Sequence, residues 1–121
     1  MPTVLIVDDS PTEIHVLKTW LEKNGFSTIT AESGEEGIQK AKAEKPDAII
    51  MDVVMPGMSG FQATRQLSKD ADTSSIPVVM VTTKDQETDK IWGMRQGAVA
   101  YLSKPVSEKQ LVDKIKEVTE G

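Results

Sequence analysis

The sequence contains no cysteine and a single histidine, His15. The missing thiols exclude disulfide bonds, thiolate catalysis and cysteine-ligated metals, and one imidazole cannot build a histidine metal site. His15 falls outside the apolar stripe of its expected helix, which predicts an exposed surface residue rather than a catalytic base. The groups left for chemistry are carboxylates, hydroxyls and amines.

Long apolar runs are also missing. No run approaches the ~20 residues that a helix needs to span a bilayer. No basic segment followed by an apolar stretch precedes the first expected strand, so a secretory signal is not expected. These absences predict a cytoplasmic protein without membrane insertion.

Positive charge is scarce, because 14 Lys and Arg stand against 19 Asp and Glu, which gives a net charge of -5. Nucleic acids and anionic membranes are bound through clustered cations, so the composition argues against both as partners and favours proteins. The length of 121 residues predicts one domain spanning residues 1–121.

Short apolar runs alternate with segments of helical spacing along the whole chain. The expected strands are 4–7, 26–31, 48–51, 78–81 and 98–102. Four of the five expected helices begin with serine followed three residues later by Glu or Gln, the capping-box pattern: Ser10 and Glu13, Ser33 and Glu36, Ser59 and Gln62, Ser107 and Gln110. The fifth, 85–96, has a weak apolar stripe. Five strands alternating with five helices predict an α/β fold, a five-stranded parallel sheet with helices on both faces.

Acidic residues follow two of the expected strands directly. Asp8 and Asp9 come after the first strand and Asp52 after the third. If these strands are parallel neighbours, the three carboxylates converge, and a divalent cation is needed to offset their repulsion. Oxygen ligands of this kind suit Mg²⁺. Helix capping and turn formation would explain each acid singly, but three acids at matched strand ends favour a site.

Two further polar side chains follow strands at the same edge of the sheet. Thr82 follows the fourth expected strand and Lys104 follows the fifth. A metal ion and an ammonium group can neutralise phosphoryl oxygens while a carboxylate attacks phosphorus, so the set predicts phosphoryl transfer to Asp52. A surface role for Lys104 and a strand-end role for Thr82 are the alternatives.

Four segments carry a family resemblance: Asp8–Asp9, Met51–Gly57 with Gly60, Val81–Thr82 and Tyr101–Pro105. In this order they resemble the receiver domain of two-component response regulators, over the whole chain. Within that family, residues 61–67 and 81–90 are similar to the chemotaxis-like, single-domain regulators of type IV pilus twitching motility. The resemblance implies the flavodoxin-like strand order 2-1-3-4-5.

The resemblance also implies roles for individual residues. Asp8, Asp9, Asp52 and the backbone carbonyl of Val54 would hold Mg²⁺, directly or through water. Asp52 would be the phosphoacceptor and would receive its phosphoryl group from a histidine kinase or a His-phosphotransfer domain.

The remaining implied roles concern the response to phosphorylation. Thr82 and Lys104 would bind the phosphoryl oxygens, a cis Lys104–Pro105 peptide would aim the lysine, and Tyr101 would be the switch aromatic.

The family's output face is the fourth helix, fifth strand and fifth helix. Because the fifth helix reaches the chain terminus, we expect no output domain. Output would be the binding of an effector, or the withdrawal of phosphoryl groups from a shared kinase. We expect a monomer that is able to dimerise on phosphorylation.

Two positions that flank the site in receivers are expected to tune its rate of dephosphorylation. Val54 cannot hydrogen-bond through its side chain, and Lys84 offers only donors. Neither can orient an attacking water molecule by accepting a proton from it, and Lys84 could shield the phosphoryl group. We therefore expect slow loss of phosphate. A solvated Lys84 without kinetic effect is the alternative.

Two other classes of protein share part of this pattern. A flavodoxin-like flavin carrier has the same architecture, but Asp8 and Asp9 would repel the flavin phosphate. A magnesium-dependent phosphohydrolase also uses an aspartyl nucleophile, but it needs a second acid as general acid/base and usually a substrate-recognition cap, and neither is evident. We expect a protein that catalyses only its own phosphorylation and dephosphorylation.

Overall fold

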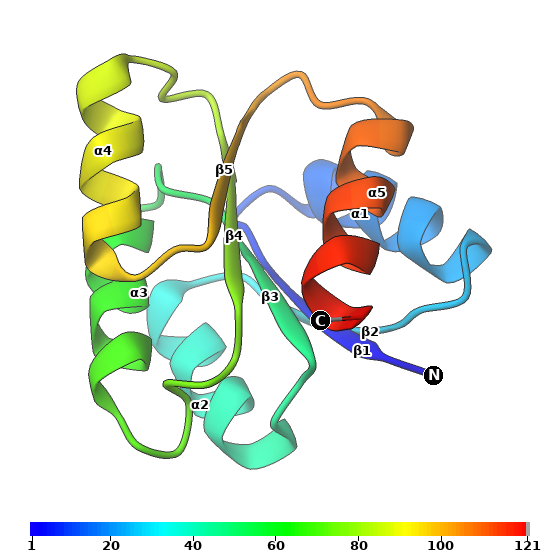
Figure 1. Cartoon of the computed structure of the whole chain (residues 1–121), viewed down its shortest axis with the longest axis horizontal. Helices are drawn as coiled ribbons and strands as arrows, with labels where there is room; N and C mark the ends of the chain where they lie inside the picture. The colour runs from blue at the N-terminus through cyan, green and yellow to red at the C-terminus, as the bar shows by residue number, and fades with distance from the viewer. Residues whose placement is uncertain (121) are drawn as a thin grey trace.

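The computed structural model describes residues 1–120 and shows five strands alternating with five helices in that range (Figure 1). The strands are β1 (Thr3–Val7), β2 (Ser27–Ala31), β3 (Ala48–Met51), β4 (Val78–Thr82) and β5 (Ala100–Ser103). The helices are α1 (Pro11–Lys23), α2 (Gly34–Glu44), α3 (Gly60–Lys69), α4 (Glu87–Gln96) and α5 (Glu108–Glu120). No helix within residues 1–120 has both the length and the apolar character needed to cross a membrane.

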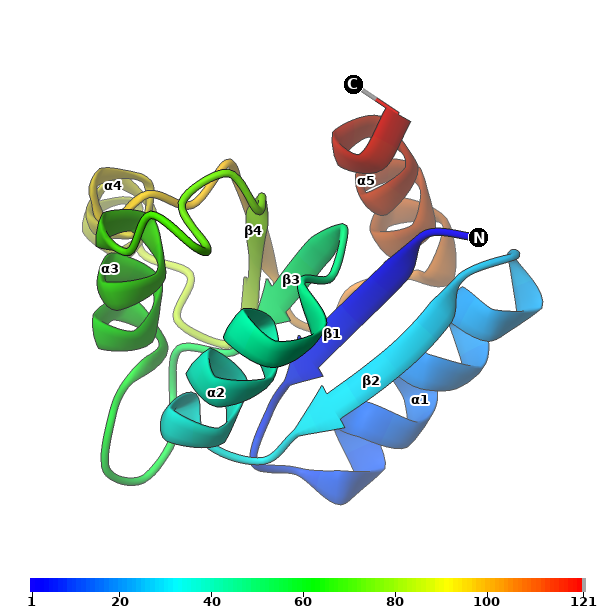
Figure 2. The same cartoon turned by 90° about the horizontal axis from the view of Figure 1, so that it is seen from below.

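The strands form one parallel sheet in the order β2-β1-β3-β4-β5. Helices α1 and α5 cover one face, and α2, α3 and α4 cover the other, as the two views in Figure 1 and Figure 2 show. The predicted fold class is therefore confirmed, including the strand order that the family resemblance implied.

The central strands are continuous apolar runs because helices cover both of their faces. In β1, Leu5 and Val7 belong to the core under α2 and α3, whereas Val4 and Ile6 belong to the core under α1 and α5. All four side chains are fully buried. Burial of each contributes about 1.5–3 kcal/mol, so β1 is strongly fixed between the two helical layers.

Two of the predicted capping boxes are complete. At α3, Gln62 N–H donates to Ser59 Oγ at 3.2 Å, and Ser59 N–H donates to Gln62 Oε1 at 2.9 Å. At α5, Ser107 and Gln110 make the same reciprocal pair at 3.1 and 3.0 Å. These caps satisfy amides that would otherwise lack partners in the first turn of each helix.

In the other two predicted capping boxes, only one of the two reciprocal hydrogen bonds forms, so the prediction is wrong for the second bond. At α1, Glu13 N–H donates to Ser10 Oγ at 3.3 Å, but Ser10 N–H donates to Asp8 Oδ1 at 2.9 Å rather than to Glu13. At α2, the Glu36 carboxylate accepts from the amide of Glu32 at 2.8 Å, one residue before the N-cap. At α1 a different acceptor, Asp8, replaces Glu13, and at α2 a different donor, the Glu32 amide, replaces that of Ser33.

Candidate functional site

The register of the central strands places the acidic residues side by side. Val7 of β1 pairs with Met51 of β3, so Asp8 and Asp52 are the next residue on each strand. The Asp52 amide extends the ladder by donating to the Val7 carbonyl at 3.0 Å. Gly60 packs so closely that a Cβ there would lie 2.0 Å from the Asp52 carbonyl oxygen. The backbone beneath Asp52 is therefore held tightly on two sides.

The three predicted metal ligands come together at this edge of the sheet. Asp8, Asp9 and Asp52 each offer a carboxylate oxygen, and these oxygens all lie within 4.8 Å of one another. Asp8 and Asp52 are buried, whereas Asp9 is exposed. The donor set consists of oxygen atoms alone and carries negative charge, which fits a hard cation such as Mg²⁺.

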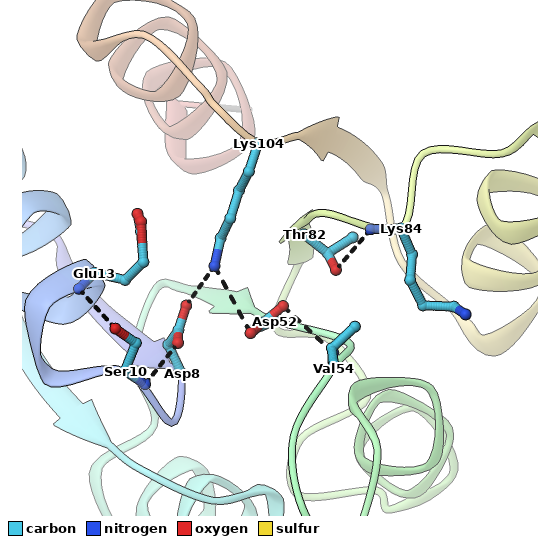
Figure 3. A network of polar contacts seen from close by, with 8 residues as sticks. All are labelled: Asp8, Ser10, Glu13, Asp52, Val54, Thr82, Lys84 and Lys104. Carbon is cyan, nitrogen blue, oxygen red and sulfur yellow. Dashed lines mark hydrogen bonds and ion pairs between the residues drawn. The ribbon is translucent and has the colours of Figure 1, made fainter.

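Lys104 directly follows β5 and reaches this cluster. Its Nζ lies 2.9 Å from Asp8 Oδ2 and 3.7 Å from Asp52 Oδ2 (Figure 3). The amide of Lys104 donates to the Thr82 carbonyl at 2.8 Å, which ties the residue to the end of β4. The Lys104–Pro105 peptide is cis, as the family resemblance implied.

Burial and charge oppose each other at Asp52 and Lys104. Burial raises the pKa of Asp52, and Asp8 adds to that effect; Lys104 opposes it without reversing it. Burial alone would lower the pKa of Lys104, but its hydrogen bond to Asp8 and the charges of Asp52, Asp8 and Glu13 outweigh burial and raise it. Lys104 is therefore firmly cationic, and the negative charge of Asp52 is incompletely compensated.

Thr82 is completely buried at the end of β4, and its Oγ accepts the amide hydrogen of Lys84 at 3.3 Å. It lies beside Asp52 in Figure 3. Tyr101 of β5 reaches the same β4–α4 loop, because its hydroxyl donates to the Lys84 carbonyl at 2.7 Å. Burial, followed by the charges of nearby acids, raises the pKa of Tyr101 to about 12.

The two positions expected to tune dephosphorylation lie on the outer side of Asp52. Val54 is 53% exposed, and its amide donates to Asp52 Oδ1 at 3.4 Å. The ammonium group of Lys84 points away from Asp52 in Figure 3 and lies 3.7 Å from Asp89 Oδ1. Lys84 therefore does not lie over the site in this structure, and shielding by it would require a different rotamer. The Val54 carbonyl as a metal ligand stays a prediction.

One residue beside Lys104 was missed as a member of the site. Glu13 was assigned a capping role from the serine three residues before it, yet its carboxylate extends beside Lys104 in Figure 3. The available signal was Asp8, which lies two residues before Ser10 and offers the Ser10 amide a nearer acceptor.

Residues 4–116 match the response regulator receiver domain family. The chain belongs to this family. It is 60% identical to Protein PilH of Pseudomonas aeruginosa over 121 residues, which is the full length of both chains.

Solved structures give the same answer for the fold. The chemotaxis protein CheY4 of Vibrio cholerae superimposes with a TM-score of 0.92 at 32% identity and covers 98% of both chains. The response regulator domain of Thermotoga maritima CheB superimposes with a TM-score of 0.90 at 30% identity, covering 100% of this chain and 98% of the other.

Proposed function

We propose that the chain is a phosphoacceptor response regulator in which Asp52 takes a phosphoryl group from a histidine kinase or a His-phosphotransfer domain. The observation that carries this proposal is the position of Asp52, which lies among Asp8, Asp9 and Lys104 at one edge of the sheet. Family membership supports it, because receivers exchange phosphoryl groups with such kinases.

The residues of the site divide the chemistry between them. A Mg²⁺ ion held by Asp8, Asp9, Asp52 and the Val54 carbonyl would supply positive charge against the phosphoryl oxygens. A carboxylate oxygen of Asp52 attacks phosphorus, a P–O bond forms, and the P–N bond to the donor imidazole breaks. Lys104 exchanges its contact with Asp8 for one with a phosphoryl oxygen. Positioning and charge compensation supply most of the acceleration in phosphoryl transfer.

Phosphorylation would reach a partner through Thr82 and Tyr101. The Thr82 side chain already acts on the Asp52 carboxylate as a hydrogen-bond partner. When Asp52 is phosphorylated, the Thr82 hydroxyl would bond a phosphoryl oxygen instead, so it interacts differently with the two states. Tyr101 contacts the loop that follows Thr82 and belongs to the face formed by α4, β5 and α5. That face is the proposed binding surface for an effector protein, and dimerisation through it is the alternative use.

The full-length similarity to PilH supports a role in type IV pilus twitching motility. That similarity also supports action as a cytoplasmic receiver domain. In such a protein the response is the binding of an effector, and the only reactions catalysed are its own phosphorylation and dephosphorylation.

The test is labelling of the purified protein by a small acyl phosphate and by phosphorylated histidine kinases, with and without Mg²⁺. We expect Mg²⁺-dependent, acid-labile label on wild type and no label on Asp52→Asn. Asp113→Asn is the control, because it removes an exposed aspartate of α5 that pairs with Lys109. Magnesium-independent label that persists in Asp52→Asn would refute the assignment.

A further inference from the structure

The carboxylate of Glu13 is free of the capping role that its position predicts. Glu13 lies in the first turn of α1, where a capping box would tie its side chain to the Ser10 amide. Asp8 accepts that amide instead, at 2.9 Å. Glu13 is only partly exposed, and its side chain extends beside Lys104 in Figure 3.

Lys104 therefore lies between acids on two sides. Asp8 and Glu13 lie on the side of α1, and Asp52 lies on the other side of the ammonium group (Figure 3). The ammonium is closer to Asp8, at 2.9 Å, than to Asp52, at 3.7 Å. The charge of Glu13 acts on Lys104 in the same sense as those of the two aspartates.

We propose that Glu13 is a positioning residue that draws the Lys104 ammonium toward Asp8 and so sets how readily it moves to a phosphoryl group on Asp52. The inference rests on the proposed function, because it concerns the same reaction. Removal of the Glu13 charge weakens the attraction on the α1 side, while Asp52 and an incoming phosphoryl group keep theirs. Lys104 then occupies the Asp52 side more often, and phosphorylation becomes faster.

The first experiment measures the rate constant for phosphorylation by a small acyl phosphate in saturating Mg²⁺. Glu13→Gln should react about threefold faster than wild type, the scale expected for one partly solvated charge. Glu13→Asp keeps the charge on a shorter side chain and should fall between the two. Saturating Mg²⁺ removes any contribution from a change in metal affinity.

The matched control is Glu35→Gln, which removes the same charge at the same edge of the sheet. The Glu35 carboxylate lies beside Gly57 in the loop that follows Asp52, 3.9 Å from the position of a Gly57 Cβ, and is not among the charges that act on Lys104. Its rate should remain near that of wild type. An equal acceleration in Glu35→Gln would show that Glu13 acts only by repelling the anionic donor, which would overturn the proposal.

A second pair of measurements shows whether Glu13 acts through Lys104. In a Lys104→Ala background, Glu13→Gln should no longer change the rate constant. In the unphosphorylated protein, Glu13→Gln should shift the NMR signals of the Lys104 side-chain terminus, and Glu35→Gln should not. Unshifted Lys104 signals, or an acceleration that persists without Lys104, would overturn the inference. Failure of wild type to be labelled at Asp52 would instead overturn the proposed function.

Discussion

Asp52 bears its charge in a place that disfavours it. The residue is 6% exposed, Asp8 is its acidic neighbour, and Lys104 is nearer to Asp8 than to Asp52. Burial is the largest cause of the raised pKa of Asp52, and repulsion from Asp8 adds to it. A carboxylate in this state is stabilised when a cation neutralises the local negative charge, so the resting site favours binding of a divalent ion.

The raised pKa makes a prediction about stability. A group whose pKa is higher in the folded than in the unfolded chain stabilises the fold below its ordinary pKa, and this contribution is lost as the pH rises through the folded-state value. At pH 7, ionised Asp52 therefore costs stability in metal-free protein. We expect Asp52→Asn to raise the free energy of unfolding at pH 7, within the range of about 0.5–3 kcal/mol common for single substitutions.

The measurement is urea unfolding in the presence of a chelator, repeated at pH values from 7 down to 4. The gain from Asp52→Asn should shrink as the pH falls, because wild-type Asp52 then binds its proton. Asp113→Asn should show no gain at pH 7, because the hydrogen bond from Lys109 lowers the pKa of that carboxyl. A less stable Asp52→Asn protein at pH 7 would contradict the account of the site.

The sequence predicts the positions of some residues of the site and not of others. Asp8 and Asp52 could be placed together because both follow apolar strands, and the carboxyl ends of parallel strands share an edge. Glu13 could not, because its place beside Lys104 depends on which acceptor the Ser10 amide finds. Asp8 and Glu13 were both candidate acceptors for the Ser10 amide hydrogen, and in the folded backbone Asp8 accepts it.

Among the elements, α4 is the least determined by its own sequence. Its large apolar side chains, Ile91, Trp92 and Met94, are between 46% and 48% exposed, and Gly93 takes the buried position against the sheet. The prediction of this helix therefore rests on Gly97, which ends it, and on its position between two strands. The backbone amide of Gln86, which precedes α4, donates to Asp89 Oδ2 at 3.3 Å. The helix therefore begins at Glu87, two residues later than predicted.

Gly93 fixes the place of Tyr101, and this makes a prediction at the level of α4 and β5. A Cβ at Gly93 would lie 2.9 Å from two ring carbons of Tyr101 and 2.7 Å from Met80 Sδ. We expect Gly93→Ala to displace the Tyr101 ring outward and to break its 2.7 Å hydrogen bond to the Lys84 carbonyl. Tyr101 is the single tyrosine in the chain, so ultraviolet titration reports its pKa directly.

Wild-type Tyr101 should titrate at about 12, and in Gly93→Ala its pKa should fall toward the ordinary value of about 10 as burial is relieved. Gly37→Ala serves as the control, because a Cβ there meets Val7 at 2.8 Å, on a helix remote from Tyr101. Circular dichroism at each pH confirms that the protein is folded. Equal titration curves for wild type and Gly93→Ala would show that Met80, not Tyr101, yields to the added methyl group.

At the scale of the whole molecule, the strand order brings residues from separate parts of the sequence together in one site. The order β2-β1-β3-β4-β5 makes β1 and β3 neighbours although an entire strand and two helices separate them in the sequence. Propensity and periodicity predict the elements but not their lateral order, which came from the resemblance to a family. The sheet then brings the carboxylates of Asp8 and Asp52 within reach of Lys104, and the net charge of -5 adds a general attraction for cations.

A cation held between β1 and β3 should therefore stabilise the entire fold. Binding to the folded chain alone raises the free energy of unfolding by about 2.7 kcal/mol when the ligand concentration is 100 times its dissociation constant. We expect Mg²⁺ to raise the unfolding midpoint of wild type in urea and EDTA to reverse the shift.

Asp9→Asn removes a ligand that is exposed, so it should reduce the shift with little change in metal-free stability. Sodium chloride at equal ionic strength separates this effect from general screening of the net charge. If sodium chloride stabilises wild type as much as Mg²⁺ does, or if Asp9→Asn responds fully to Mg²⁺, the three carboxylates do not form a metal site.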